Sequence, residues 1–354
     1  MNLRLRDLHS RIAKAKLECL LVTSPANISY LVKFASRDSY LLVSKKESIY
    51  FTDSRYIDEV RPRLLKEGIA ARLISGPVFD TIAAACEDLN LKRIGFEGQS
   101  LTTAAHKRLQ EVINCKCRLI LTNSMIEEIR QIKDSEELRK IKKALHITMA
   151  ALRFARKLIK PGKKEIEVAA ELERFIRYQG ATSSAFDMIV ASGPNSAYPH
   201  HAPGSRKIKN NEPVLIDIGV EYQGYKSDLT RVYFLGKINF LAQQVSKTVF
   251  KAQSLALSKI RPGVKIAEID RVSRNYIAAA GYGEHFGHSL GHGVGLETHE
   301  SPRISGRTEG LLKPGMVFTV EPAIYLVGKF GIRIEDMVLV TKKGCKVLSG
   351  AINQ

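Results

Sequence analysis

The sequence repeats one pattern, first as KPGKKEIEVAAELERFIRYQG at residues 160–180 and again as RPGVKIAEIDRVSRNYIAAAG at residues 261–281. Each copy begins with a basic residue, Pro and Gly, and Pro161 and Gly180 are as far apart as Pro262 and Gly281. Pro-Gly ends the amphipathic helix before it, and the apolar spacing after it predicts a second helix closed by glycine. Matched spacing over this length favours an internal repeat.

An acid ends the apolar stretch that follows each copy, since PVLID stops at Asp217 and MVFTVE stops at Glu321. We interpret both stretches as buried β-strands. The sequence therefore predicts two related α/β halves that face each other. Acids from both halves are expected to converge on one shared centre.

Two further acids lie in apolar surroundings. Asp228, in SDLTR, is expected on the return strand of a hairpin-like pair, and Glu335, in IRIEDMVLV, on an alternating strand. A carboxylate on a core strand is costly unless it is paired or binds a metal. A single such acid is usually one end of a buried ion pair. Four acids in matching places of two repeats instead favour a set of ligands.

Histidines gather in the same part of the chain. The stretch HFGHSLGHGVGLETHESP, residues 285–302, is so rich in glycine that we expect an irregular segment or strand that allows close approach. His292, between two glycines, is the candidate ligand of imidazole type. His201 and His285 are expected to be structural or exposed, although one of the neighbours His200 and His201 must point away and the sequence leaves open which.

Four carboxylates and one imidazole would suit two divalent metal ions. Two such ions would neutralise the four negative charges, and bridging carboxylates would hold them roughly 3.5–4 Å apart. The oxygen-rich donor set favours Mn²⁺, with Co²⁺, Fe²⁺ or Zn²⁺ as alternatives.

The N-terminal residues 1–122 are expected to form a separate α/β domain. Leu5, Leu8, Ile12 and Ala15 have helical spacing. Strands are expected near residues 20–22, 40–43, 48–51, 93–96 and 118–121, and helices near residues 55–66, 79–89 and 103–112.

A second domain, residues 123–354, is expected to follow. Asp134 can cap a long helix, Glu137 stands at the reciprocal position of a capping box, and the helix should end near residue 159.

The composition excludes several classes of protein. With 354 residues, 44% hydrophobic and 26% charged, the chain is expected to be soluble and to form two domains. It has neither a signal-peptide pattern nor a run of roughly 18 apolar residues, which favours a cytoplasmic protein without a membrane span. The net charge of +19 is spread evenly, so we expect a solvated surface and no nucleic-acid partner.

Short stretches along the chain resemble a known family. VLIDIG, KSDLTR, LGHGVGLETHE, GMVFTVEP and GIRIED resemble motifs of the pita-bread metallopeptidases. SPANISYLVKF and FTDSRY resemble the creatinase-type N-terminal domain of the proline-specific members, with Lys33-Phe34 where Gly-Phe is usual. The resemblance covers nearly the whole chain. It implies an α/β creatinase-like domain followed by an α+β pita-bread domain with an internal pseudo-two-fold repeat.

Carried over position by position, the resemblance implies a metal-binding role for five residues. Asp217 would bind one ion, Asp228 and Glu335 would bridge both ions, and His292 and Glu321 would complete the second site. Two neighbours are expected to support Asp228, namely Thr230 and Arg231.

The resemblance also implies a substrate pocket lined by His200, His288 and His299. His299 or Glu321 would pass a proton to the leaving nitrogen. Arg333 precedes Glu335 by two positions, so both are expected on one side of a strand, where Arg333 would meet a substrate carboxylate.

The function expected from this resemblance is an aminopeptidase that cleaves short peptides with proline at the second position. An Xaa-Pro dipeptidase, or prolidase, is the alternative, disfavoured because no second basic residue forms a clear clamp with Arg333. The extra N-terminal domain disfavours a methionine aminopeptidase, and the complete ligand set disfavours a non-catalytic pita-bread binding protein. The resemblance suggests a homodimer.

Overall fold

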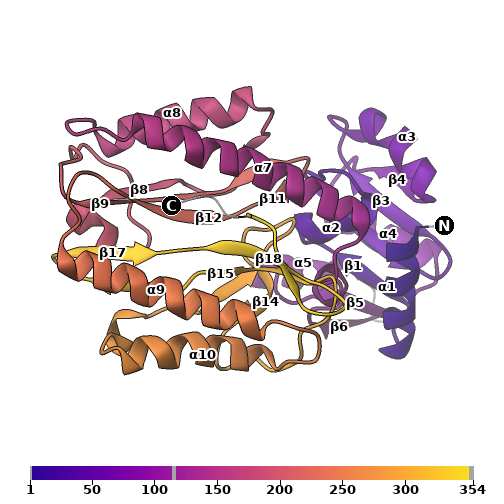
Figure 1. Cartoon of the computed structure of the whole chain (residues 1–354). Helices are drawn as coiled ribbons and strands as arrows, with labels where there is room; N and C mark the ends of the chain where they lie inside the picture. The colour runs from indigo at the N-terminus through magenta and orange to yellow at the C-terminus, as the bar shows by residue number, and fades with distance from the viewer. Residues whose placement is uncertain (1, 114–116, 351–354) are drawn as a thin grey trace. The chain divides into compact units, whose positions relative to one another are not determined.

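The chain forms two compact units in a computed structural model that describes residues 2–113 and 117–350 (Figure 1). The units divide after Arg130, beyond the boundary expected at residues 122/123, so the short helix α6 (Glu127–Arg130) stays with the first unit. Asn27 holds α6 to the first unit. Its Nδ2 donates to Glu127 Oε1 over 2.7 Å, and its Oδ1 accepts from Arg130 Nη1 over 2.7 Å.

The first unit is built on a six-stranded mixed sheet with the strand order β4-β3-β2-β1-β5-β6. The strands are β1 (Cys19–Val22), β2 (Ser39–Ser44), β3 (Ser48–Thr52), β4 (Ala70–Leu73), β5 (Arg93–Glu97) and β6 (Arg118–Thr122). The other helices are α1 (Leu3–Lys14), α2 (Pro25–Val32), α3 (Ile57–Glu67), α4 (Val78–Asp88) and α5 (Thr103–Val112). The sequence did not predict α2 or β4. Strand β4 lies half exposed at the edge of the sheet and therefore has no apolar run.

Lys33 ends α2 in a conformation that favours glycine. Its φ of 64° lies in the left-handed region, which suits the glycine expected at this turn from the resemblance described above. The loop keeps this geometry with a lysine, whose Nζ lies 2.9 Å from Glu67 Oε2.

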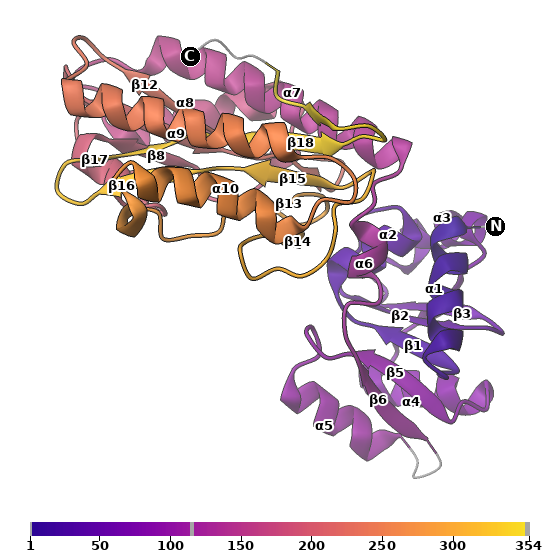
Figure 2. The same ribbon diagram turned by 60° about the horizontal axis from the view of Figure 1, so that its bottom comes forward.

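The second unit places its strands between two pairs of helices, α7 with α8 on one side and α9 with α10 on the other (Figures 1 and 2). Its helices are α7 (Ser135–Leu158), α8 (Glu165–Tyr178), α9 (Phe240–Lys259), α10 (Ile266–Ala279) and the 3₁₀ turns η1 (Gly193–Ala197) and η2 (Gly283–His285). The capping box of Asp134 and Glu137 is confirmed at the start of α7.

Short strands fill the middle of this unit. They are β7 (Ser183–Ser184), β8 (Ile189–Ser192), β9 (Pro213–Ile218), β10 (Val220–Tyr222), β11 (Tyr225–Lys226), β12 (Leu229–Phe234), β13 (Gly291–Gly293), β14 (Glu300–Ile304), β15 (Val317–Val320), β16 (Ala323–Leu326), β17 (Phe330–Arg333), β18 (Asp336–Val340) and β19 (Cys345–Val347). One hydrophobic cluster joins α7 and α8 to β8 and β9, and another joins α9 and α10 to β15–β18.

The internal repeat is confirmed by matching backbone contacts. Gly162 N–H donates to Ile208 O over 2.8 Å, and Gly263 N–H donates to Leu312 O over 2.9 Å. Both glycines have positive φ, 88° and 82°. Asp217 lies as far beyond Ile208 as Glu321 lies beyond Leu312, so these two acids occupy equivalent places in the two halves.

The repeat also explains where the other two acids lie. In the first half β9 pairs antiparallel with β12, and Asp228 immediately precedes β12. In the second half β15 pairs antiparallel with β18, and Glu335 immediately precedes β18. Each half therefore presents two acids at the ends of two paired strands.

Within the described residues, no helix is both long and apolar enough to cross a membrane. Four cysteines in the same ranges are free thiols, namely Cys19, Cys86, Cys117 and Cys345, whereas Cys115 lies outside the described residues.

Candidate metal centre

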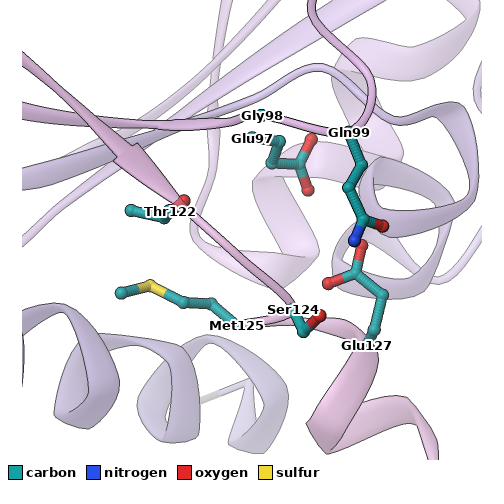
Figure 3. Close-up of a pocket in the computed structure, with 7 residues that line it drawn as sticks. All are labelled: Glu97, Gly98, Gln99, Thr122, Ser124, Met125 and Glu127. Carbon is teal, nitrogen blue, oxygen red and sulfur yellow. The ribbon is translucent and has the colours of Figure 1, made fainter.

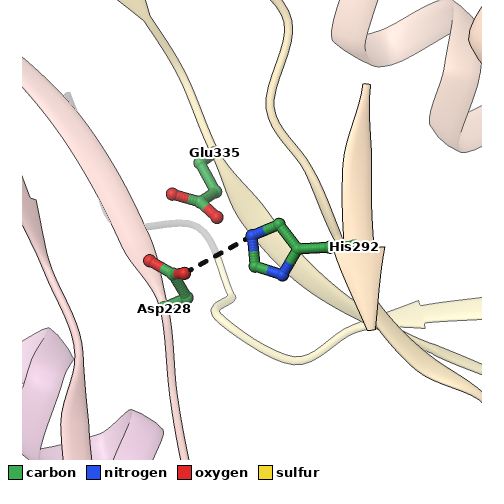
Figure 4. Close-up of side chains that lie close together, drawn as sticks. All are labelled: Asp228, His292 and Glu335. Carbon is green, nitrogen blue, oxygen red and sulfur yellow. Dashed lines mark ion pairs between the residues drawn. The ribbon is translucent and has the colours of Figure 1, made fainter. Parts of the chain in front are cut away.

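Asp228, His292 and Glu335 lie close together between the two halves of the second unit (Figure 4). Each offers one ligand atom, and these atoms all lie within 4.8 Å of one another. His292 Nε2 is 3.6 Å from Asp228 Oδ2. His292 lies on the short glycine-rich strand β13 of the second half. Its imidazole therefore meets Asp228, which belongs to the first half.

The other two predicted ligands adjoin this group. Glu321 Oε1 lies 3.3 Å from His292 Nε2 and accepts a hydrogen bond from Thr319 Oγ1 over 3.1 Å. Asp217 is buried, and its Oδ2 accepts a hydrogen bond from Arg333 Nη2. The structure thus groups Asp228, His292 and Glu335 directly and places Glu321 beside His292, whereas Asp217 is joined to the group through Arg333 and Thr230.

Arg333 has a different environment from the one expected. Its guanidinium is buried and donates to Asp217, to Tyr325 Oη over 2.6 Å and to Thr230 Oγ1 over 3.1 Å. A fourth contact reaches Pro199 O over 3.4 Å. The role of Arg333 in binding a substrate carboxylate stays a prediction, since in this structure its donors serve the acid cluster.

The single strand expected around Glu335 is wrong. Arg333 ends β17, which pairs only with β16, and β18 begins at Asp336 in the five-stranded sheet. The chain passes from one sheet to the other at residues 334–335, where Glu335 N–H donates to Thr230 O over 3.3 Å. Alternation therefore does not relate Arg333 to Glu335, yet both side chains meet at the Thr230 hydroxyl, which donates to Glu335 Oε2 over 2.7 Å.

Thr230 and Arg231 support Glu335 instead of Asp228, for which they were predicted. Arg231 donates to the backbone oxygen of Glu335 and forms an ion pair of 2.6 Å with Asp336. Gln253 on α9 also donates to Asp336, over 3.1 Å. This polar network fixes the backbone at the point where the chain changes sheet.

The acids differ in their electrostatics. Burial, and then the charges of Glu335 and Asp217, hold the pKa of Asp228 well above its ordinary value. Burial, and then the charges of Glu321 and Asp217, raise the pKa of Glu335 in the same direction. Burial also opposes ionisation of Glu321, but the hydrogen bond and charge of His292 outweigh it and lower the pKa of Glu321.

The three pocket histidines predicted from the sequence occupy different surroundings. The ring of His299 packs edge-on against His292 with a centroid separation of 4.2 Å. Burial, and then the charge of His292, lowers the pKa of His299, and the charge of His200 acts in the same direction. His288 Nε2 lies 3.1 Å from Tyr325 Oη, and burial lowers its pKa.

Sequence reasoning missed Tyr325 and Thr319. Tyr325 joins Arg333 to His288, and burial raises its pKa to about 12. Thr319 accepts the His292 N–H over 3.1 Å and donates to Glu321. Both lie on apolar strands, where a tyrosine or threonine is usually interpreted as a core residue. No signal in the single sequence distinguishes them.

The chemistry of the cluster fits divalent metal ions. Asp217 Oδ1 and Glu335 Oε1 are buried and have no hydrogen-bond partner in the part of the chain that the structure describes. A buried polar atom left unpaired costs about 1–3 kcal/mol, and more when it is charged. His292 Nδ1 lies 3.2 Å from Gly293 O, which leaves Nε2 directed at the acids. Carboxylate oxygens with one imidazole form a donor set that metals such as Mn²⁺ accept.

A second group of acids, in the first unit, has a structural explanation. Glu97, Gln99 and Glu127 line a small pocket (Figure 3). Glu97 Oε2 accepts the N–H groups of Thr23 and Ser24 over 2.7 and 2.8 Å, and its Oε1 accepts from Asn27 over 2.6 Å. These bonds satisfy Glu97 and hold the start of α2 to the end of β5.

Comparison with known proteins agrees with this architecture. Residues 139–342 match metallopeptidase family M24, and residues 4–132 match the creatinase/prolidase N-terminal domain. The chain is 35% identical to an Xaa-Pro dipeptidase of Pyrococcus horikoshii, with 99% of this chain and 97% of that protein covered.

Two solved structures are also similar. One is an Xaa-Pro dipeptidase from Bacillus anthracis, with a TM-score of 0.95, 36% identity and coverage of 99% and 98% of the two chains. The other is an X-Pro aminopeptidase from Thermotoga maritima, with a TM-score of 0.88, 34% identity and coverage of 97% and 99%.

Proposed function

The chain belongs to metallopeptidase family M24, and from that premise we propose that it is a metal-dependent Xaa-Pro dipeptidase. The observation that carries the hydrolytic part is the cluster of buried acids, in which Asp217 Oδ1 and Glu335 Oε1 have no hydrogen-bond partner among residues 2–113 and 117–350. The relative from Pyrococcus horikoshii and the structure from Bacillus anthracis, both named Xaa-Pro dipeptidases, support the dipeptide substrate.

This proposal reverses the preference for an aminopeptidase that the sequence suggested. That preference depended on Arg333 being a lone clamp for a carboxylate, but Arg333 already donates to Asp217, Tyr325 and Thr230. The argument from Arg333 therefore favours neither substrate length. An X-Pro aminopeptidase stays the second candidate because the structure from Thermotoga maritima is named as one.

We assign the binding of two divalent ions to Asp217, Asp228, His292, Glu321 and Glu335. Such ions, when bound, lower the pKa of water and polarise the scissile carbonyl. Asp217 and Asp228 come from the first half of the second unit, and Glu321 and Glu335 come from the second half. The proposed metal site therefore lies between the two halves. Arg333 holds Asp217 in place, and Thr230 holds Glu335.

The histidines next to the cluster are proposed to handle substrate and proton. The lowered pKa of His299 keeps its imidazole neutral near pH 7, so it can accept a proton and release it to the leaving nitrogen. That nitrogen has no N–H when proline follows the scissile bond, so it needs a proton donor and not a hydrogen-bond acceptor. His200 and His288 are proposed to contact the substrate on either side.

The test compares Ala-Pro with Ala-Pro-Ala after chelator treatment and addition of Mn²⁺, Co²⁺ or Zn²⁺. We expect metal-dependent cleavage of Ala-Pro, with kcat/KM at least about tenfold higher than for the tripeptide, which corresponds to about 1.4 kcal/mol. Equal or faster cleavage of Ala-Pro-Ala would establish the aminopeptidase instead. Absence of cleavage of both peptides with every metal would refute proline-specific hydrolysis.

Arg333→Ala separates two roles of this residue. Because its donors serve Asp217, we expect similar losses for Ala-Pro and Ala-Pro-Ala. A loss confined to the dipeptide would show that Arg333 binds the proline carboxylate.

A further inference from the structure

A buried carboxylate outside the acid cluster holds the segment that carries His200. Glu165 is the first residue of α8, and its side chain is 0% exposed. Its Oε1 accepts the Ser192 N–H over 2.8 Å and the Ser192 hydroxyl over 2.7 Å. Its Oε2 lies 2.8 Å from His201 Nε2 and accepts the Gly204 N–H over 3.4 Å. One side chain thus binds the segment before and after His200.

These hydrogen bonds keep the carboxylate charged. Asn195 Nδ2 adds contacts of 3.1 Å to both of its oxygens. Burial opposes ionisation of Glu165, but the hydrogen bonds from Ser192, His201 and Asn195 outweigh it and lower the pKa of Glu165. Hydrogen bonds to a charged acceptor are shorter and stronger than those between neutral groups, so this attachment is firm.

The His200 ring itself has no such attachment. It is exposed, and no hydrogen bond to it is found among residues 2–113 and 117–350. It nevertheless lies near the acid cluster, since Arg333, which donates to Asp217, also contacts the backbone oxygen of Pro199, the residue before His200, over 3.4 Å. The position of an exposed ring without hydrogen bonds of its own depends on the backbone that carries it.

We propose that Glu165 is a positioning residue that fixes His200 at the substrate site by holding Ser192 and His201 on either side of it. This inference rests on the proposed function, because contact between His200 and substrate is part of that function. It also gives the neighbours His200 and His201 separate tasks: His201 is bound to the buried acid, and His200 is left for the substrate.

The test is a double-mutant cycle of Glu165→Gln and His200→Ala, measured on Ala-Pro with metal content determined for each variant. Glutamine keeps the size of the side chain but removes its charge and two acceptor sites. We expect Glu165→Gln to lower kcat/KM about tenfold at unchanged metal content. The double variant should be no worse than His200→Ala alone, because Glu165 acts through His200. Additive losses would overturn the proposal.

Glu171→Gln is the matched control. Glu171 lies on the same helix, but it pairs at the surface with Arg174 over 2.9 Å and does not touch the His200 segment. Its kcat/KM should equal that of the wild type. A tenfold loss in this variant would show that any change of charge on α8 is enough, and the proposal would fail.

His201→Ala provides an independent test if Glu165→Gln does not fold. Glu165 then keeps its bonds to Ser192 and Asn195 and the longer contact with Gly204, so only the shorter of the two attachments after His200 is lost. We expect a smaller loss in kcat/KM, again absent in the His200→Ala background. Wild-type kcat/KM in this variant would contradict the proposal.

An NMR measurement separates this inference from the proposed function. The ring resonance of His200, assigned from its absence in His200→Ala, should shift in Glu165→Gln and stay unchanged in Glu171→Gln. This result is expected even if the wild type fails to cleave Ala-Pro, in which case only the function would be refuted. An unchanged His200 resonance in Glu165→Gln would refute the positioning role.

Discussion

The two halves of the second unit have the same backbone plan and different chemistry. Each begins with a helix, a Pro-Gly turn and a second helix, and each places one acid at the end of a strand and one before its antiparallel partner. The second half adds an imidazole, His292, and a guanidinium, Arg333, that donates to Asp217. The buried guanidinium of the first half, Arg231, pairs instead with Asp336.

The difference shows how a repeat becomes an asymmetric site. Asp217 and Glu321 are equivalent in the repeat, yet Asp217 is compensated by Arg333 and Glu321 by His292. Both compensating residues come from the second half. The second half therefore supplies the partners of these two acids, whereas the first half supplies Thr230 and Arg231, which hold Glu335.

The largest effect is expected at the place where the halves meet. Asp228→Ala should lower turnover of Ala-Pro by at least about a thousandfold, because loss of a residue proposed to bind both ions would remove several kcal/mol of metal-assisted stabilisation. Steady-state kinetics and circular dichroism measure activity and folding separately. Glu284→Ala, an exposed acid of the same unit, should keep full activity. Wild-type turnover in Asp228→Ala would disprove the ligand assignment.

Arg333→Met tests the asymmetry in compensation. It leaves Asp217 buried beside other acids without its cation, so the free energy of unfolding of the metal-free protein should fall by about 3–5 kcal/mol. Urea unfolding measures this value. The exposed Arg261→Met should change it by less than about 0.5 kcal/mol. Equal losses in the two variants would mean that the buried pair contributes no more than a surface cation.

Much of this plan could be predicted from the sequence, because the repeat is carried by local signals. Pro-Gly turns, helical spacing and acids at the ends of apolar runs located the helices and the strands around Asp217 and Glu321. The break between β17 and β18 could not be predicted, because IRIEDMVLV contains no glycine or proline that would mark the end of a strand. The change of sheet depends on bonds from Thr230 and Arg231, which are distant in sequence.

The candidate metal centre, too, could be predicted from the sequence only in part. Residue types and spacing singled out the acids and His292 as candidate ligands, but the partner of each acid depends on tertiary structure. Arg333 was expected to face substrate, and its contact with Asp217 spans the two halves. Tyr325 has no signal in its sequence neighbourhood, and only its buried contacts with Arg333 and His288 reveal it.

A smaller effect on stability is expected at Glu165, the buried acid at the start of α8. Glu165→Gln should lower the free energy of unfolding by about 1–3 kcal/mol at pH 7. Burial opposes ionisation of Glu165, but its hydrogen bonds outweigh burial and lower its pKa in the folded protein. The ionised carboxylate therefore contributes fully to the free energy of unfolding above the pKa of the unfolded chain, about 4.3, and this contribution is lost as the pH falls through the pKa of the folded protein. Thermal unfolding of both proteins from pH 7 to pH 3 should show the difference shrinking. A difference that grows toward acid pH would contradict this sign.

The smallest effect concerns the equivalence of the two turns. Gly162→Ala and Gly263→Ala should each cost about 1–2 kcal/mol, because both have φ above 80° and open space around an added Cβ, so only backbone strain changes. Gly344→Ala, in open space without positive φ, is the control. Denaturant unfolding should give equal costs for the two turns. Clearly unequal costs would mean that the halves do not share this element of the repeat.

Metal titration of the chelator-treated protein tests the central claim most directly. We expect the metal-free protein to be inactive on Ala-Pro, and calorimetric titration with Mn²⁺ to show two ions bound per chain as cleavage is restored. Asp228→Ala should bind fewer ions and stay inactive. Full hydrolysis by protein shown to be free of metal, or a wild type that binds no divalent ion, would contradict the account.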